Sequence, residues 1–159
     1  IIFIVMKNQK NTKKNEQRLE FFTVYGENLK KIYIHEPTIS AGFPSPADDY
    51  VDTELNLHKY LVKHPAATYF VRASGYSMEK AGIYDGDLLV VDKSQEVKNR
   101  DIVIAYVNGE FTVKRYIIEK TKIILKAESN SKIYLNIEIN EETEFEIWGV
   151  VTYTIHKNK

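Results

Sequence analysis

A serine and a lysine are the residues whose types and placement best fit catalysis. Ser77 lies in the segment Ser74-Gly75-Tyr76-Ser77-Met78, directly after an apolar run at 67–73 that predicts a strand. Lys114 lies in the second strand of an expected β-hairpin. A serine hydroxyl is a poor nucleophile until a base takes its proton, and lysine is a base only when it is neutral. Because burial lowers the pKa of a lysine, a lysine among apolar residues has the property that this chemistry needs.

The same two residues also have an ordinary structural interpretation. A serine beside a glycine at the end of a strand is common in turns, and a lysine in an apolar strand can extend its head group to solvent. From the residue types alone, the Ser77/Lys114 pair is therefore a hypothesis, and an exposed strand lysine remains open.

Other catalytic and metal-binding chemistry finds little support in the sequence. The chain has no cysteine, which excludes disulfides, thiolate catalysis and cysteine-based metal sites. No glycine-rich phosphate loop is present. The four histidines are His35, His58, His64 and His156. Their spacing does not match a metal-binding motif, so we assign them surface or structural roles. We therefore expect no cofactor and no metal.

The elements that must position the serine and the lysine are short strands. Asn108-Gly109 separates two strand-like runs, and this dipeptide is a strong hairpin signal because both turn residues must accept positive φ. One short helix is expected where Leu57, Tyr60 and Leu61 fall at helical spacing, before Pro65. Strands are expected at 67–71, 88–91, 102–107, 110–116, 122–125 and 145–155. The sequence thus predicts a mostly β fold of short strands with one short helix.

Size and charge describe one domain with a distinct N-terminal arm. The chain has 159 residues and no apolar run long enough for a membrane-spanning helix. The net charge is zero, but residues 1–31 hold seven Lys/Arg against three Asp/Glu. We expect a flexible, polar arm with a helical turn near 16–22, and a natural start at Met6. The rest of the chain carries a net −4, which is a poor basis for gripping a phosphate backbone.

A proline-rich segment joins the arm to the strands. Pro44 and Pro46 follow Gly42 closely, and prolines at this spacing exclude helix and favour an extended, exposed chain. That is the form in which a protease accepts its substrate. It is also the form of a simple linker.

Several motifs in order resemble the LexA/UmuD family of self-cleaving Ser/Lys proteins, and most closely its UmuD-like SOS mutagenesis members. They are Ala41–Ala47, His64-Pro65, 67–71, Ala73-Ser74-Gly75 with Ser77-Met78, 85–89, 101–105 and 109–114. The resemblance spans roughly residues 40–154. It implies a compact peptidase domain in which Ser77 is the nucleophile, Lys114 is the general base, and Ala41–Gly42 is the bond that is cut. Two positions depart from the pattern: Tyr76 replaces an acidic or apolar residue, and Ala41 replaces a cysteine.

The resemblance also implies a biological role. Residues 1–41 would be the arm removed by self-cleavage, and 42–159 the peptidase and polymerase-interaction domain. The expected partners are the RecA–single-strand DNA filament as the stimulus, a UmuC-like Y-family DNA polymerase, and a second copy in a homodimer. The expected location is the cytoplasm, with no membrane contact and no sequence-specific DNA binding. Since Lys114 must be neutral, we expect self-cleavage to rise from neutral pH to about pH 10.

Three other functions remain open at this stage. One alternative is a non-catalytic polymerase-interaction module, and another is a fragment of a LexA-type phage or plasmid repressor, although the arm shows no helix-turn-helix pattern. A signal peptidase also uses a Ser/Lys pair, but it needs a membrane anchor, and the apolar stretch Ile1–Val5 is too short for one.

Overall fold

The computed structural model describes residues 20–23, 32–36 and 51–158. The expected start at Met6, the Ala41–Gly42 bond and the proline-rich segment lie outside these residues. So does the rest of the expected flexible arm. Within the described ranges, no helix is long and apolar enough to cross a membrane.

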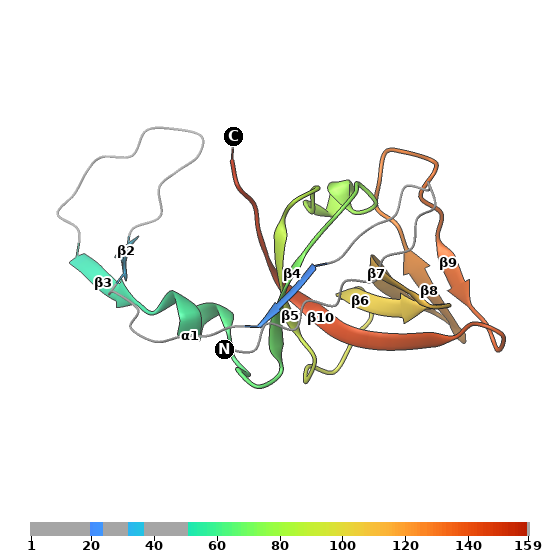
Figure 1. The fold of residues 1–159 in the computed structure, drawn as a ribbon, viewed down its shortest axis with the longest axis horizontal. Coiled ribbons are helices and arrows are strands. Elements are labelled where there is room, and N and C mark those ends of the chain that lie inside the picture. Colours follow the sequence, from blue (N-terminus) through green and yellow to red (C-terminus); the bar gives the residue numbers. More distant parts are fainter. Residues whose placement is uncertain (1–19, 24–31, 37–50, 159) are drawn as a thin grey trace.

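Ten strands, one short α-helix and one 3-10 turn make up the described chain, and the expected mostly β fold with one short helix is confirmed (Figure 1). The elements are β1 (Glu20–Thr23), β2 (Ile32–Glu36), β3 (Val51–Leu55), α1 (Leu57–Leu61), β4 (Thr68–Arg72), η1 (Glu79–Ala81), β5 (Leu88–Asp92), β6 (Ile102–Val107), β7 (Glu110–Glu119), β8 (Lys122–Lys126), β9 (Ile137–Ile139) and β10 (Phe145–Ile155). Eight strands form one antiparallel sheet in the order β1-β4-β5-β10-β6-β7-β8-β9.

Local sequence signals explain two of these elements. Asn108 and Gly109 adopt φ of 47° and 90° and connect β6 to β7, as the hairpin signal predicts. The helix α1 begins after Asn56, whose side chain accepts a hydrogen bond from the N–H of Lys59 at 2.9 Å. The hairpin matters most for function because it sets the register of β7, the strand that carries Lys114.

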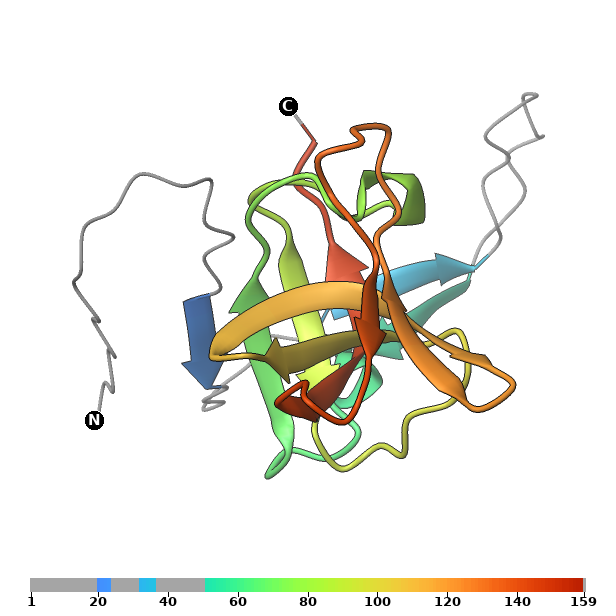
Figure 2. The ribbon, with the colours of Figure 1, turned by 90° about the vertical axis from the view of Figure 1, so that its right-hand side faces the viewer.

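The long strand β10 holds the two halves of the sheet together. Its first half pairs with β6 and its second half with β5, with a register shift in each pairing. Gly149 lies at the shift beside β6, where an added Cβ would stand 2.7 Å from a methyl group of Val91. A side chain does not fit there, so glycine lets β10 pass closely over β5. The strongly curved sheet encloses two clusters of buried aliphatic residues (Figure 2).

The N-terminal strands correct one expectation. Residues 20–23, near which a helical turn was expected, form strand β1, which pairs with β4 at the edge of the large sheet. β2 pairs with β3 in a separate two-stranded sheet that projects from the body (Figures 1 and 2). Phe21, Phe22 and Thr23 are strand-forming residue types, and they form a strand by pairing with a segment about fifty residues later, a contact that local sequence does not encode.

Candidate active site

Ser77 lies on the loop between β4 and η1, beside the core cluster that contains Met78, Ile83 and Val113. The loop turns through Gly75, which has a φ of 87° and therefore needs glycine. The N–H of Gly75 donates to a carboxylate oxygen of Asp85 at 2.8 Å, which fixes the turn. The next residue, Met78, is 2% exposed and packs in the core. Ser77 itself is only 3% exposed, so the hydroxyl points inward rather than to solvent.

Lys114 reaches this hydroxyl from β7. It stands opposite Val103 of β6 and is 4% exposed, so the alternative of a solvent-exposed strand lysine is wrong. Its Nζ lies 3.2 Å from Ser77 Oγ, 2.9 Å from Thr112 Oγ1 and 3.1 Å from the carbonyl oxygen of Val113. The structure therefore brings together the two residues that the sequence analysis singled out.

Burial changes the acid–base behaviour of this lysine. Removal of the ammonium from water lowers the pKa of Lys114 from an ordinary 10.5 to about 8. None of the three polar atoms around Nζ carries a negative charge that would favour the protonated form. A neutral amine has two N–H groups and one lone pair. The hydroxyl of Thr112 and the carbonyl of Val113 can accept the two N–H groups, which leaves the lone pair for the Ser77 proton.

This lowered pKa predicts that Lys114 destabilises the fold. Below pH 8 the lysine is protonated in both folded and unfolded chains, and burial of the charge has its full cost. Between pH 8 and 10.5 the unfolded chain holds the proton and the folded chain does not, so the stability of the protein rises with pH. In a Ser77→Ala background, Lys114→Met should raise the free energy of unfolding by about 2 kcal/mol at pH 6, and by less above pH 10.

Urea unfolding at pH 6, 8 and 10 measures this difference. The exposed lysine Lys126 provides the matched control, because Lys126→Met should change the free energy of unfolding by no more than about 0.5 kcal/mol. A Lys114→Met protein that is less stable than its parent at pH 6 would contradict the cost of the buried charge.

A small apolar pocket opens beside Ser77. Its lining is Ala73, Ser74, Gly75, Ser77, Met78, Ile83 and Val113. Apart from the two serines these residues offer only aliphatic groups, glycine backbone and a thioether. The pocket therefore suits a small apolar side chain next to the serine hydroxyl.

The loop after β8 braces the serine loop from the other side. The carbonyl of Ser77 accepts the N–H of Glu128 at 2.8 Å, and the N–H of Lys80 donates to the carbonyl of Glu128 at 2.8 Å. The Glu128 carboxylate binds the guanidinium of Arg115 through two hydrogen bonds of 2.8 and 2.9 Å. These bonds from Arg115 hold the pKa of Glu128 below its usual range. In this way β7 carries Lys114 and, one residue later, the group that anchors the Ser77 loop.

Several residues of this site were not anticipated. Strand alternation does place Thr112 on the same face of β7 as Lys114, but its hydrogen bond with Lys114 Nζ was not predicted. Asp85 precedes Gly86 in a sequence typical of a turn, which does not indicate its bond to the N–H of Gly75. Arg115 and Glu128 carry no local signal, because their contact depends on how β7 and β8 pair.

The histidines lie outside the Ser77/Lys114 contacts. His64 Nδ1 is 2.6 Å from the buried carboxylate of Asp92, and His156 Nδ1 is 2.6 Å from that of Asp87. The side chain of His35 lies outside the described residues. In the part of the chain that the structure describes, no group of three His, Asp or Glu side chains is placed to hold a metal ion.

Comparison with known proteins identifies the family of the chain. The model of the family described as Peptidase S24-like matches residues 31–152, a range that includes both Ser77 and Lys114. Protein MucA of Salmonella typhimurium is 49% identical over 117 residues, which are 74% of this chain and 79% of MucA. Protein SamA of the same species is 49% identical over 119 residues, 75% of this chain and 81% of SamA.

A more distant relative is the LexA repressor of Psychromonas ingrahamii. It is 38% identical over 117 residues, which are 74% of this chain but 55% of the repressor. The resemblance to the LexA/UmuD family, and to its UmuD-like members, is thus confirmed. The chain belongs to the Peptidase S24-like family.

Proposed function

We propose that this chain is a UmuD-like self-cleaving serine peptidase that cuts its own Ala41–Gly42 bond with Ser77 as nucleophile and Lys114 as general base. The observation that carries the proposal is the buried contact of 3.2 Å between Lys114 Nζ and Ser77 Oγ. In this contact the base is within reach of the proton it must remove, and burial brings its pKa near the working pH.

The reaction runs in two halves. In the first half, Lys114 takes the Ser77 proton while Oγ attacks the carbonyl carbon of Ala41, which gives a tetrahedral intermediate. The intermediate collapses when the Lys114 ammonium gives that proton to the nitrogen of Gly42. This leaves an ester between Ser77 and Ala41. Water, deprotonated by Lys114, then attacks the ester, and Ser77 recovers its proton as the carboxylate of Ala41 leaves.

The negative charge on the oxygen of the tetrahedral intermediate needs a hydrogen-bond donor to stabilise it. The backbone N–H of Ser77 makes no hydrogen bond to another described residue and is therefore available to the oxyanion. The loop that carries it is held by Asp85 on one side and Glu128 on the other. A donor that is fixed before the reaction stabilises the developing charge without reorganisation.

The pocket beside Ser77 supports Ala41 as the residue on the carbonyl side of the cut. Its short apolar wall accepts a methyl group, and Gly42 permits the backbone to approach closely. Purified protein at pH 9 should yield fragments of 41 and 118 residues, the larger beginning at Gly42, by mass spectrometry and N-terminal sequencing. Ala41→Trp should reduce the rate at least about 100-fold because the indole does not fit, and Gly42→Val should also slow it. Lys132→Ala serves as an exposed control, and a product beginning elsewhere than Gly42 would refute the bond.

The biological part of the proposal follows from the family. Residues 1–41 are the removable arm, 42–159 the active product, and the RecA–single-strand DNA filament the stimulus for cutting. The product acts in the cytoplasm as a homodimer with a UmuC-like Y-family polymerase in translesion synthesis. The larger shared fraction of MucA and SamA than of LexA favours this role over that of a repressor fragment. Cells whose DNA is damaged should show the shift from the long to the short form.

A further inference from the structure

Strand β1 covers an edge of the large sheet. It is the terminal strand on one side, and its only neighbour in the sheet is β4. The two strands pair antiparallel over four consecutive positions, from Glu20 opposite Arg72 to Thr23 opposite Tyr69. Without β1, the backbone of β4 would form the edge (Figure 1).

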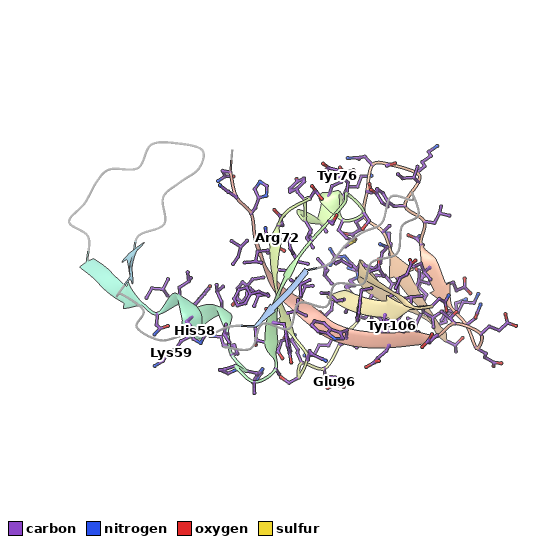
Figure 3. The ribbon with its side chains drawn as sticks, viewed as in Figure 1. His58, Lys59, Arg72, Tyr76, Glu96 and Tyr106 are labelled. Atoms are coloured by element: carbon purple, nitrogen blue, oxygen red, sulfur yellow. The ribbon has the colours of Figure 1, made fainter. Side chains whose placement is uncertain are left out.

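β4 has the sequence of an interior strand rather than that of an edge. Natural edge strands are protected by lysine, proline or a bulge. The residues of β4 are Thr-Tyr-Phe-Val-Arg, without proline, and they pair with β5 over five consecutive positions without a bulge. The single charged residue of the strand, Arg72 (labelled in Figure 3), donates from its guanidinium to the carbonyl of Gly86 at 2.9 Å. The edge is therefore regular, rich in strand-forming residues and suited to pairing.

The proposed cleavage bond lies between β1 and β4 in the chain. While the chain is intact, β1 is tethered to β4, and a tether of this kind supplies an effective concentration on the order of millimolar. Once the bond is cut, β1 belongs to a separate fragment. That fragment also contains β2, so it contacts the cut protein over four paired positions through β1 and over five through β2. Strand contacts this short are marginal in water, so loss of the covalent link favours departure of the fragment, and β1 leaves with it.

We propose that self-cleavage vacates the β4 edge, and that the vacated edge binds an extended segment of a partner protein as an added antiparallel strand. The segment has an acidic residue followed by two aromatic residues, the pattern of Glu20-Phe21-Phe22. The timing of this event rests on the proposed function, whereas the edge and its specificity do not.

The register of β1 supplies the chemistry of the partner. An acidic residue stands opposite Arg72, and aromatic residues stand opposite Val71 and Phe70. Opposite charges and aromatic–aliphatic pairs at facing positions stabilise antiparallel strands. A second copy of β4, paired about Phe70, would place Thr68 opposite Arg72 and offer the arginine no acid. The charge pattern thus favours an acidic partner segment over self-pairing.

The test begins with chains that cannot cut themselves. Full-length Ser77→Ala is compared with Ser77→Ala carrying Phe21→Pro and Phe22→Pro. Because successive N–H groups of a strand point to opposite sides, one of the two prolines removes a donor that faces β4. Ser77→Ala with Thr12→Pro is the matched control, with the same residue type in the same arm. The probe is a synthetic peptide of residues 17–26, beside one with lysine in place of Glu20.

Hydrogen exchange and peptide titration give the readouts. In the double-proline chain, exchange of amides in 68–72 should speed at least tenfold, and the probe should restore protection. The probe should bind this chain at least tenfold more tightly than it binds Ser77→Ala or the Thr12→Pro control, and the lysine peptide should bind at least fivefold more weakly. Wild-type protein cut at pH 9 should bind the probe like the double-proline chain after its fragment is removed by native chromatography.

Other outcomes overturn the proposal. Unchanged exchange in 68–72 would show that β1 does not cover the edge. A double-proline chain that dimerises and ignores the probe would assign the edge to a second copy. An arm fragment that stays on the cut protein at micromolar dilution would show that cleavage does not vacate it. If the wild type fails to cut itself while the double-proline chain binds the probe, then the proposed function fails and the edge specificity stands.

Discussion

Alanine at either Ser77 or Lys114 is expected to stop self-cleavage, with a loss in rate of at least about 1,000-fold. Ser77→Ala removes the nucleophile, and Lys114→Ala removes the group 3.2 Å from it that takes the proton. Since the two act as one unit, the double variant should be no slower than the single variants. The measurement is the fraction of intact chain on a denaturing gel after incubation at pH 9.

Conservative variants separate the chemistry from the packing. Lys114→Arg keeps a long cationic side chain but cannot become neutral in this pH range, so it should be as inactive as Lys114→Ala. The exposed Lys126→Ala should cut at the rate of the parent. Circular dichroism should show the same fold in every variant. A Lys114→Ala protein that cuts normally would remove the lysine from the mechanism, whatever its position in the structure.

The rate of self-cleavage should rise about tenfold per pH unit below pH 8 and level off near pH 9. The reactive form contains neutral Lys114, whose pKa is lowered by burial to about 8. The neutral fraction then grows about 90-fold between pH 6 and pH 9 and changes little above that. The sequence alone set the upper limit near pH 10, because it contained no measure of burial. The observed burial moves the expected plateau down by about one unit.

First-order rate constants at constant ionic strength, from pH 5.5 to 10, give this profile. His64→Gln and His156→Gln should leave its midpoint in place, because both histidines pair with aspartates away from Ser77. A rate that is flat across the range would contradict a lysine base. A midpoint near pH 6.5 that disappears in one of the histidine variants would transfer the role to that histidine.

The sequence predicted most of the body of the fold for identifiable reasons. Asn108-Gly109 encodes its hairpin locally, and alternation along β7 separates the face of Lys114 from that of Arg115. The pairing of Ser77 with Lys114 came from resemblance to a family, since residue types alone left a solvent-exposed lysine open.

What the sequence did not predict depends on contacts between distant segments. Strand β1 exists through its pairing with β4, and its own polar flanks favoured an arm with a helical turn. The bond between Arg115 and Glu128 depends on the register of β7 and β8. Neither a propensity nor a short motif contains that information.

The hairpin of β2 and β3 separates two events that a denaturing gel records as one. β2 ends at Glu36, β3 begins at Val51, and the proposed bond lies between them, so each product keeps one strand of the pair. Hydrolysis first gives a nicked complex that is still joined over five paired positions. When the two products dissociate they gain translational entropy, which makes the cut harder to reverse. The products do not gain this entropy while β2 and β3 remain paired. Strand separation, rather than hydrolysis of the peptide bond, is therefore the step that makes cleavage irreversible. Native mass spectrometry over time would measure when the strands separate.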